Sequence, residues 1–271
     1  MSVHNEQART TPRRLAEMRK SRSPIVCLTA YDAGFAAVLD AAGVDVILVG
    51  DSLGMVVQGH ETTVPVTLEQ MVYHASLAAR GTCRALLMVD MPFMSYATPE
   101  QALANAARLM QEGGAQMVKL EGDGAQQEVV SALARQGIPV CAHLGLRPQS
   151  IHKLGGYRVQ GREPHAAERM IHDAVALQDA GADMLLLECV PALLAAEIRG
   201  MVEIPVIGIG AGVDCDGQIL VLQDVLGITT RPPRFVKDFM AEAGSVQGAV
   251  QAYVAAVRER RFPGPEHGFT A

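Results

Sequence analysis

The chain has 271 residues, 49% of them apolar, and its 23 Lys and Arg residues against 29 Asp and Glu give a formal charge of −6. This length is typical of one large α/β domain that needs no disulfide to fold. The negative charge and the 4% aromatic content argue against a nucleic-acid partner, and every apolar run is shorter than the roughly 18 residues of a membrane-spanning helix.

The N-terminal segment carries a basic cluster at Arg13, Arg14, Arg19, Lys20 and Arg22. Because the cluster also holds Glu17 and leads straight into a strand-like run, we predict the solvated face of an N-terminal helix, not a targeting sequence. Residues 1–11 are predicted to form a flexible N-terminus. The first thirty residues lack a continuous apolar stretch of the signal-peptide type, so we expect a cytoplasmic protein without a membrane partner.

Short β-branched or leucine-rich runs then recur along the chain. They predict strands at 25–30, 44–50, 85–90, 116–121, 138–145, 183–189, 204–210 and 218–224. Alanine-rich segments with helical periodicity lie between them. These segments predict helices at 32–43, 67–81, 98–114, 128–137, 165–181 and 191–200, each ending at or near a glycine.

This alternation of strands and helices is typical of repeated βα units around a parallel sheet. It predicts the α/β class and a single (β/α)8 TIM barrel over residues 1–271, with a doubly wound open sheet as the alternative. Two connections that follow strands are unusually long, at 51–66 and 145–164. Both are rich in glycine and polar residues, so we expect mobile covers at the end of the barrel where active sites lie.

The five cysteines form no CxxC pair. They are Cys27, Cys83, Cys141, Cys189 and Cys215, and four of them lie in or beside apolar runs. We therefore predict reduced and mostly buried thiols, with no disulfide.

Ionisable side chains collect at the ends of the predicted strands. They are Asp51, Asp90, Lys119, Glu121, His143 and Glu188. Side chains alternate along a strand, so Lys119 and Glu121 point the same way, into the mouth of the barrel. An acid at such a place is often only the cap of the next helix. Several charges that converge at one rim, however, are costly to bury unless they are paired or bind a cation, which indicates a functional site.

Three of these residues, Asp51, Asp90 and Glu121, form a set of oxygen ligands suited to Mg²⁺. His143 is either a further ligand or a hydrogen-bonding residue, and Lys119 is either a counter-ion or the partner of an anionic substrate. Glu188 follows an apolar run that should raise its pKa into the range of a proton-transferring base, with a helix-capping or salt-bridged role as the alternative. The glycine-rich run at 208–212 is weak evidence for an anion-binding loop.

Longer strings carry a resemblance to a known family. TAYDAGFA (29–36), VGDSLGMVVQGHETTVPVTLEQM (49–71), VDMPFMSYATPEQALANAARLM (89–110), MVKLEG (117–122), PVCAHLGLRPQSI (139–151), GGYRVQGR (155–162), LLLECVP (185–191) and IPVIGIGAG (204–212) closely resemble ketopantoate hydroxymethyltransferase. The resemblance covers about residues 12–268. It is looser at 227–235 and gives no guide to the first ten residues.

The resemblance implies a (β/α)8 barrel that transfers a hydroxymethyl group from 5,10-methylenetetrahydrofolate to 3-methyl-2-oxobutanoate. The product would be 2-dehydropantoate, used in pantothenate and coenzyme A biosynthesis, and the family's members assemble as homodecamers. Matched by position, the metal-binding acids are Asp51, Asp90 and Glu121, and the general base is Glu188. The substrate contacts are Asp51, Ser52, Asp90 and Lys119, to which we add His143.

The resemblance implies a mechanism in which Glu188 removes the C3 proton of the keto acid and Mg²⁺ stabilises the enolate that forms. The enolate carbon then attacks the one-carbon unit of the folate. Two other functions remain open from the residues. A related Mg²⁺ lyase of the isocitrate lyase or phosphoenolpyruvate mutase group would use similar rim carboxylates, although such lyases carry a loop cysteine and neither long loop here has one. A non-catalytic barrel that binds a keto acid would need no base at Glu188.

Overall fold

The computed structural model describes residues 9–270. Its centre is a closed barrel of eight parallel strands in sequential order, in which β8 pairs with β1 and Ile25 lies opposite Gly217. The strands are β1 (Ile25–Thr29), β2 (Val46–Val49), β3 (Leu86–Asp90), β4 (Met117–Glu121), β5 (Val140–Gly145), β6 (Met184–Glu188), β7 (Val206–Ile209) and β8 (Gly217–Leu220). The predicted (β/α)8 barrel is confirmed, and the open sheet is excluded.

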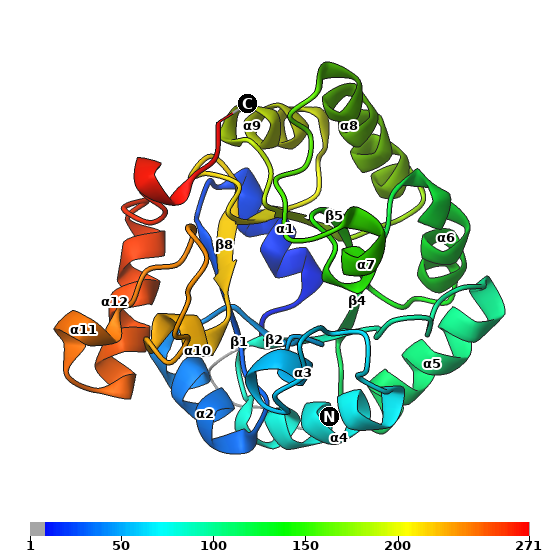
Figure 1. The fold of residues 1–271 in the computed structure, drawn as a ribbon. Coiled ribbons are helices and arrows are strands. Elements are labelled where there is room, and N and C mark those ends of the chain that lie inside the picture. The colour runs from blue at the N-terminus through cyan, green and yellow to red at the C-terminus, as the bar shows by residue number, and fades with distance from the viewer. Residues whose placement is uncertain (1–8, 271) are drawn as a thin grey trace.

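Helices surround the barrel (Figure 1). They are α1 (Pro12–Lys20), α2 (Ala33–Ala42), α3 (Leu53–Val56), α4 (Leu68–Gly81), α5 (Pro99–Gln111), α6 (Gln127–Arg135), α7 (Ile151–Leu154), α8 (Pro164–Asp179), α9 (Ala192–Met201), α10 (Leu222–Val225), α11 (Met240–Ala243) and α12 (Val246–Arg258). Three 3₁₀ turns, η1 (Gly124–Gln126), η2 (Pro148–Ser150) and η3 (Pro265–His267), complete the set. Within residues 9–270, none of the helices combines the length and apolar character required to cross a membrane.

Local sequence explains where the outer helices begin. Thr67 accepts a hydrogen bond from the backbone N–H of Gln70, whose side chain accepts one from the N–H of Thr67, and this capping box starts α4. Thr98 and Ser245 cap α5 and α12 in the simpler way. The apolar face of each helix then packs on the strands, whose side chains are buried on both sides of the barrel wall.

The C-terminal quarter of the chain departs from prediction in two respects. The strand predicted at 218–224 ends at Leu220, and α10 follows at once. The backbone N–H of Leu222 donates to Thr29 Oγ1 at 3.0 Å, which turns the chain away from the sheet. A short apolar run is too short for its periodicity to distinguish a strand from a helix, so the strand predicted from the sequence was longer than β8. The helix α12 was not predicted at all.

The N-terminal end of the barrel is fastened by one repeated contact. The side chain of the residue directly before each even-numbered strand accepts a hydrogen bond. The donor is the backbone N–H of the first or second residue of the preceding odd-numbered strand. The four pairs are Asp45 with Val26, Gln116 with Leu87, Asp183 with Val140 and Asp216 with Val206, at 2.8–3.0 Å. These side chains join β1 to β2, β3 to β4, β5 to β6 and β7 to β8.

Helix α1 lies across this same end of the barrel (Figure 1). Arg19 forms an ion pair with Asp216 and donates to the carbonyl oxygens of Arg199 and Val202. Its side chain is only 13% exposed, so the prediction of a solvated basic face is wrong for Arg19, because a buried carboxylate lies within its reach. The other four basic residues of the cluster are exposed, as predicted.

The segment predicted to be flexible, residues 1–11, falls mostly outside the described residues, which begin at residue 9. Within the described part, the backbone N–H of Thr10 donates to the carbonyl oxygen of Arg84 at 2.7 Å. Thr11 caps α1. The cysteines follow prediction, since all five are free thiols and only Cys83 is exposed.

The two long connections contain short helices. The connection after β2 forms α3, where Leu53 and Gly54 are buried, and the connection after β5 forms η2 and α7, where Gln149 and Ile151 are buried. The prediction that these segments are mobile covers, not packed structure, is therefore wrong for these parts. Polar and apolar side chains from both connections pack onto the barrel mouth and line it.

Candidate active site

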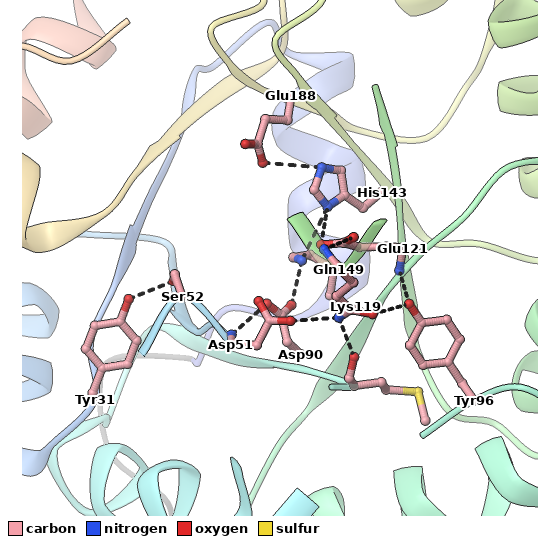
Figure 2. Close-up of polar contacts among 11 residues, drawn as sticks. Tyr31, Asp51, Ser52, Asp90, Tyr96, Lys119, Glu121, His143, Gln149 and Glu188 are labelled. Carbon is pink, nitrogen blue, oxygen red and sulfur yellow. Dashed lines mark hydrogen bonds and ion pairs between the residues drawn. The ribbon is translucent and has the colours of Figure 1, made fainter. Parts of the chain in front are cut away.

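A cavity of about 590 Å³ opens at the C-terminal ends of the strands. All seven residues predicted for the site line it, and they come from the ends of five strands. They are Asp51, Ser52, Asp90, Lys119, Glu121, His143 and Glu188. Figure 2 shows their side chains converging on one space within the barrel. The structure therefore brings together every side chain that the sequence placed at the rim.

Lys119 is the cation at the centre of this group. Its Nζ atom lies 2.7 Å from Asp90 Oδ1 and 3.5 Å from His143 Nδ1. Burial alone would lower the pKa of Lys119, but the charges of Asp90, Glu121 and Asp51 together outweigh burial and raise it above its ordinary value. Lys119 is therefore positively charged at neutral pH, although its side chain is only 5% exposed.

The end of β2 is drawn close to the end of β3. The backbone N–H of Asp51 donates to Asp90 Oδ2 at 3.0 Å. A Cβ atom at Gly50 would lie 2.9 Å from Ser52 Oγ and 3.3 Å from Asp90 Oδ2, so this approach requires glycine. Ser52 Oγ in turn shares a hydrogen bond of 2.9 Å with Tyr31 OH. The hydroxyl of Ser52 is thereby held at the wall of the cavity.

Gln149 links two of the acids. Its side-chain Nε2 donates to Asp51 Oδ2 at 2.8 Å and to the carbonyl oxygen of Met91 at 2.9 Å, and its backbone N–H donates to Glu121 Oε2 at 3.0 Å. The hydroxyl of Tyr96 donates to Gln149 Oε1 at 2.5 Å and accepts from the backbone N–H of Glu121 at 3.2 Å. One loop residue therefore sets the positions of carboxylates from two strands.

His143 lies between Glu188 and Lys119 (Figure 2). Its Nε2 atom is 3.4 Å from Glu188 Oε2, and its Nδ1 atom is 3.7 Å from Glu121 Oε1. Burial and the nearby charge of Lys119 hold the pKa of His143 well below its usual range, so the ring is neutral. Within residues 9–270, the buried Nε2 atom has no hydrogen-bond partner.

Glu188 ends β6 and keeps its side chain 15% exposed to the cavity. Gly145 adopts a φ of 92°, and a Cβ atom there would lie 2.2 Å from the carbonyl oxygen of Glu188. That glycine lets the chain after β5 pass close to β6, where Leu146 N–H donates to the same oxygen at 2.8 Å. Burial raises the pKa of Glu188 to about 8, although Lys119 acts to lower it. The predicted shift toward the range of a general base is confirmed.

Asp51 and Glu121 also hold their protons more tightly than usual. Burial, followed by repulsion from Asp90, raises the pKa of Asp51 to about 7. Burial and the charge of Asp51 raise the pKa of Glu121 well above its usual value. In the deep part of the cavity four carboxyl groups thus surround a single lysine, so acidic groups outnumber cations there.

The donor set suits a hard divalent cation. Carboxylate oxygens are the ligands that Mg²⁺ prefers, and a cation would offset the excess of acidic groups. Within the described residues, no group of three or more His, Cys, Asp and Glu side chains is arranged as a metal site. This agrees with the usual binding of Mg²⁺ through one or two carboxylates, with waters and substrate oxygens filling the other positions. The residues therefore fit the ion as an open site, not as a closed cage.

The sequence prediction missed Gln149, Tyr96 and Tyr31. Each is neutral, so none stood out in a search for charges at the ends of strands. Gln149 and Tyr96 belong to connections whose folded path no periodicity predicts, and Tyr31 closely follows β1. The available signal was local, because Gln149 and Tyr96 lie within two of the strings that carry the family resemblance.

Comparisons with known proteins show what the chain as a whole resembles. The family model described as ketopantoate hydroxymethyltransferase matches residues 9–265. A 3-methyl-2-oxobutanoate hydroxymethyltransferase from Alkalilimnicola ehrlichii is 66% identical over 257 residues, covering 94% of this chain and 93% of that protein. A protein of the same name from Halorhodospira halophila is 61% identical over 268 residues, covering 99% of this chain and 98% of that protein.

Among solved structures, 2,3-dimethylmalate lyase, a member of the PEP mutase/isocitrate lyase superfamily, aligns with a TM-score of 0.53 and 18% identity. The alignment covers 73% of this chain and 71% of that chain. At this level of identity the likeness shows a shared barrel fold and nothing about the reaction.

Proposed function

The chain belongs to the ketopantoate hydroxymethyltransferase family and is therefore a one-carbon transferase, and we propose that it transfers a hydroxymethyl group from 5,10-methylenetetrahydrofolate to 3-methyl-2-oxobutanoate. The product would be 2-dehydropantoate. The observation that carries the proposal is the largely buried Glu188 carboxyl, with a pKa of about 8, in the deep part of the cavity beside a charged lysine and the carboxyls of Asp51, Asp90 and Glu121.

The keto acid would bind through its anionic end. Lys119 is buried and charged, so it attracts a carboxylate into the deep part of the cavity, where the other charged side chains are carboxyls. Ser52, whose hydroxyl is fixed by Tyr31, supplies a second polar contact. The neutral His143 ring lies between Lys119 and Glu188, so it can orient the substrate without adding charge.

Asp51, Asp90 and Glu121 would hold Mg²⁺, one or two of them directly and the rest through waters bound to the ion. When bound, the ion would neutralise the negative charge that develops on the 2-oxo oxygen during proton removal. Gln149 would keep the carboxylates of Asp51 and Glu121 directed into the cavity, because it donates to both.

Glu188 would act as the general base. It removes the proton from C3 of the keto acid, and the electron pair of that C–H bond remains on the substrate. C3 then forms a bond to the methylene carbon of the folate as the bond from that carbon to one folate nitrogen breaks. Water supplies the hydroxyl group as the bond from the same carbon to the second folate nitrogen breaks. The proton taken by Glu188 and the second proton of the water go to the two departing nitrogens.

Family membership favours this reaction over the two alternatives that the sequence left open. A non-catalytic keto-acid binder would have no use for a carboxyl whose pKa is raised to about 8 in the cavity. The likeness to a lyase of the PEP mutase/isocitrate lyase superfamily extends to the fold alone. We further propose a single domain, a cytoplasmic location and a homodecameric assembly, which proteolysis, cell fractionation and light scattering respectively test.

The decisive experiment follows 3-methyl-2-oxobutanoate by proton NMR in D₂O with the protein, Mg²⁺ and tetrahydrofolate. We expect loss of the C3 proton signal, prevented by a chelator, and a new hydroxymethyl signal once formaldehyde is added. Exchange without the hydroxymethyl product would overturn the transfer step. Absence of both, from folded and metal-loaded protein, would overturn the proposed reaction as a whole.

A further inference from the structure

The cavity is larger than the keto acid requires. Its volume of about 590 Å³ is within the range of pockets that hold drug-sized ligands, whereas the keto acid has only five carbons. The residues assigned to the keto acid come from β2 to β6. The other side of the cavity is formed by β8, α10 and the chain that follows α10. Figure 1 shows α10 next to β8 and β1. The reaction described above leaves this side without a role.

Asp224 is the buried acid of that second side. It lines the cavity from α10, is 7% exposed, and belongs to neither the metal nor the keto-acid set. Its Oδ1 atom accepts a hydrogen bond from Thr229 Oγ1 at 2.5 Å, and within residues 9–270 its Oδ2 atom accepts none. Burial raises the pKa of Asp224. A carboxyl buried with one oxygen free can accept paired hydrogen bonds from a flat, nitrogen-rich ring edge.

The outer part of the same side is cationic and apolar. Arg231 and Arg234 line the cavity and are exposed at its mouth. Neither forms an ion pair with an acid among residues 9–270. Arg234 donates only through Nε, to the carbonyl oxygen of Glu266 at 2.9 Å, and its guanidinium lies 5.8 Å from the centre of the Phe269 ring. Phe235 and Phe269 add an aromatic wall beside these arginines.

Charge is therefore divided across the cavity. The deep part holds four carboxyls and one lysine, whereas the mouth holds two arginines without acidic partners among the described residues. A ligand that suits the second side has a flat ring with N–H donors along one edge, an apolar middle and anionic groups at the far end. The folate donor of the proposed function has this order of groups.

We propose that Asp224, Arg231 and Arg234 form the binding site for the folate co-substrate. Asp224 accepts hydrogen bonds from the amino-pyrimidinone edge of the pteridine ring, and the two arginines pair with the carboxylates of the glutamate tail. Phe235 and Phe269 cover the ring system between them. This inference rests on the proposed function, and it assigns the second substrate to residues that the keto-acid site does not use.

The inner contact is tested with Asp224→Asn and two probes, tetrahydrofolate and its 2-desamino analogue, by anaerobic calorimetry. Asparagine keeps an acceptor for Thr229 and so preserves the loop. We expect the variant to bind tetrahydrofolate about tenfold more weakly than the parent, because hydrogen bonds to a charged acceptor are lost. The 2-desamino analogue keeps the ring N3–H but lacks the amino donor, so the substitution should weaken its binding less than that of tetrahydrofolate.

The outer contact is tested with the double variant Arg231→Gln and Arg234→Gln. Its affinity for tetrahydrofolate should fall about tenfold or more, whereas its affinity for tetrahydropteroate, which lacks the glutamate tail and keeps a single carboxylate, should fall less. Arg169→Gln, at an exposed arginine on α8 outside the cavity, is the matched control and should bind both probes as the parent does.

Two results would overturn the assignment. Parent-like binding of tetrahydrofolate by both variants would show that the folate lies elsewhere, while one-carbon transfer by the parent would leave the proposed function intact. A parent protein that binds both analogues as tightly as tetrahydrofolate would likewise overturn it, without any variant. A parent that binds no tetrahydrofolate and yields no hydroxymethyl product would instead overturn the proposed function together with this site.

Discussion

The two ends of the barrel treat buried acids in opposite ways. At the N-terminal end, the carboxylate of Asp216 is paired with Arg19 and Arg199 and also accepts from the backbone N–H of Val206. At the C-terminal end, Asp51 and Glu188 share a cavity with other carboxyls and one lysine. The first arrangement satisfies each charge with protein groups. The second leaves charge unbalanced, which is what a site that must attract a cation and move a proton requires.

The contrast predicts that acids at one end serve catalysis and those at the other serve stability. Glu188→Gln gives the largest effect. The C3 exchange rate of 3-methyl-2-oxobutanoate should fall about 10²- to 10⁴-fold, because glutamine cannot accept the proton, and NMR in D₂O measures it. Glu197→Gln, at an exposed residue on α9, is the control. Exchange at the parent rate in Glu188→Gln would show that another group is the base.

The C3 exchange rate of the parent protein, measured in the same assay, should depend on pH. Glu188 must be ionised to accept a proton, and its pKa is about 8. The exchange rate should therefore rise about tenfold per pH unit below that value and level off above it. A rate that is already flat from about pH 5 to about pH 7 would contradict this assignment of the base.

At the opposite end of the barrel, Asp216→Asn should lower the free energy of unfolding by about 3–5 kcal/mol, because two arginines lose their buried partner. Chemical denaturation measures the change. Asp214→Asn, at an exposed acid two residues earlier, should leave stability nearly unchanged. If Asp216→Asn were as stable as the parent, the contrast between the two ends would fail.

A smaller effect concerns the stability of the metal-free protein. Below about pH 4.5 the Glu188 carboxyl is protonated in both folded and unfolded chains, and its contribution to stability is fully present. As pH rises toward about 8, the unfolded chain releases this proton first, so stability falls. Glu188→Gln does not titrate and should be more stable than the parent at about pH 9, on the order of a few kcal/mol. Denaturation curves on either side of this range measure the difference.

The smallest effect tests the link between two acids. Gln149→Leu removes the donor to Asp51, so the Mg²⁺ concentration for half-maximal exchange should rise about tenfold, in line with loss of a hydrogen bond to a charged group. Gln251→Leu on the exposed face of α12 is the matched control. A loss of exchange rate with no change in Mg²⁺ dependence would argue that Gln149 has a purely structural role.

Sequence was a strong guide to the barrel and to its charged residues, for a physical reason. Strand runs and capping glycines are local, and the end of a parallel strand always faces the same side of the barrel, so Lys119 and Glu121 were placed correctly without any coordinates. The local evidence failed at β8, where a short apolar run has two possible structures. It also failed at Arg19, whose partner Asp216 is distant in sequence.

Local sequence patterns did not predict the positions of Gln149 and Asp224. Gln149 contacts Asp51 and Glu121 only because the connection after β5 folds back over the barrel, and no periodic pattern specifies that path. Asp224 was hidden in a segment interpreted as the end of a strand. Both errors concern side chains whose position depends on contacts that are formed only in the folded chain.

The caps at the N-terminal end divide the barrel into four strand pairs, each fastened by one side chain to one backbone N–H. Among the described residues, no such cap spans the seam between β4 and β5. A chain cut in the partly exposed turn at η1 would therefore give two fragments that each keep two complete pairs, and co-expression of these fragments should reassemble the barrel. The two polypeptides would then share one active site, with Lys119 and Glu121 on the first and His143 and Glu188 on the second.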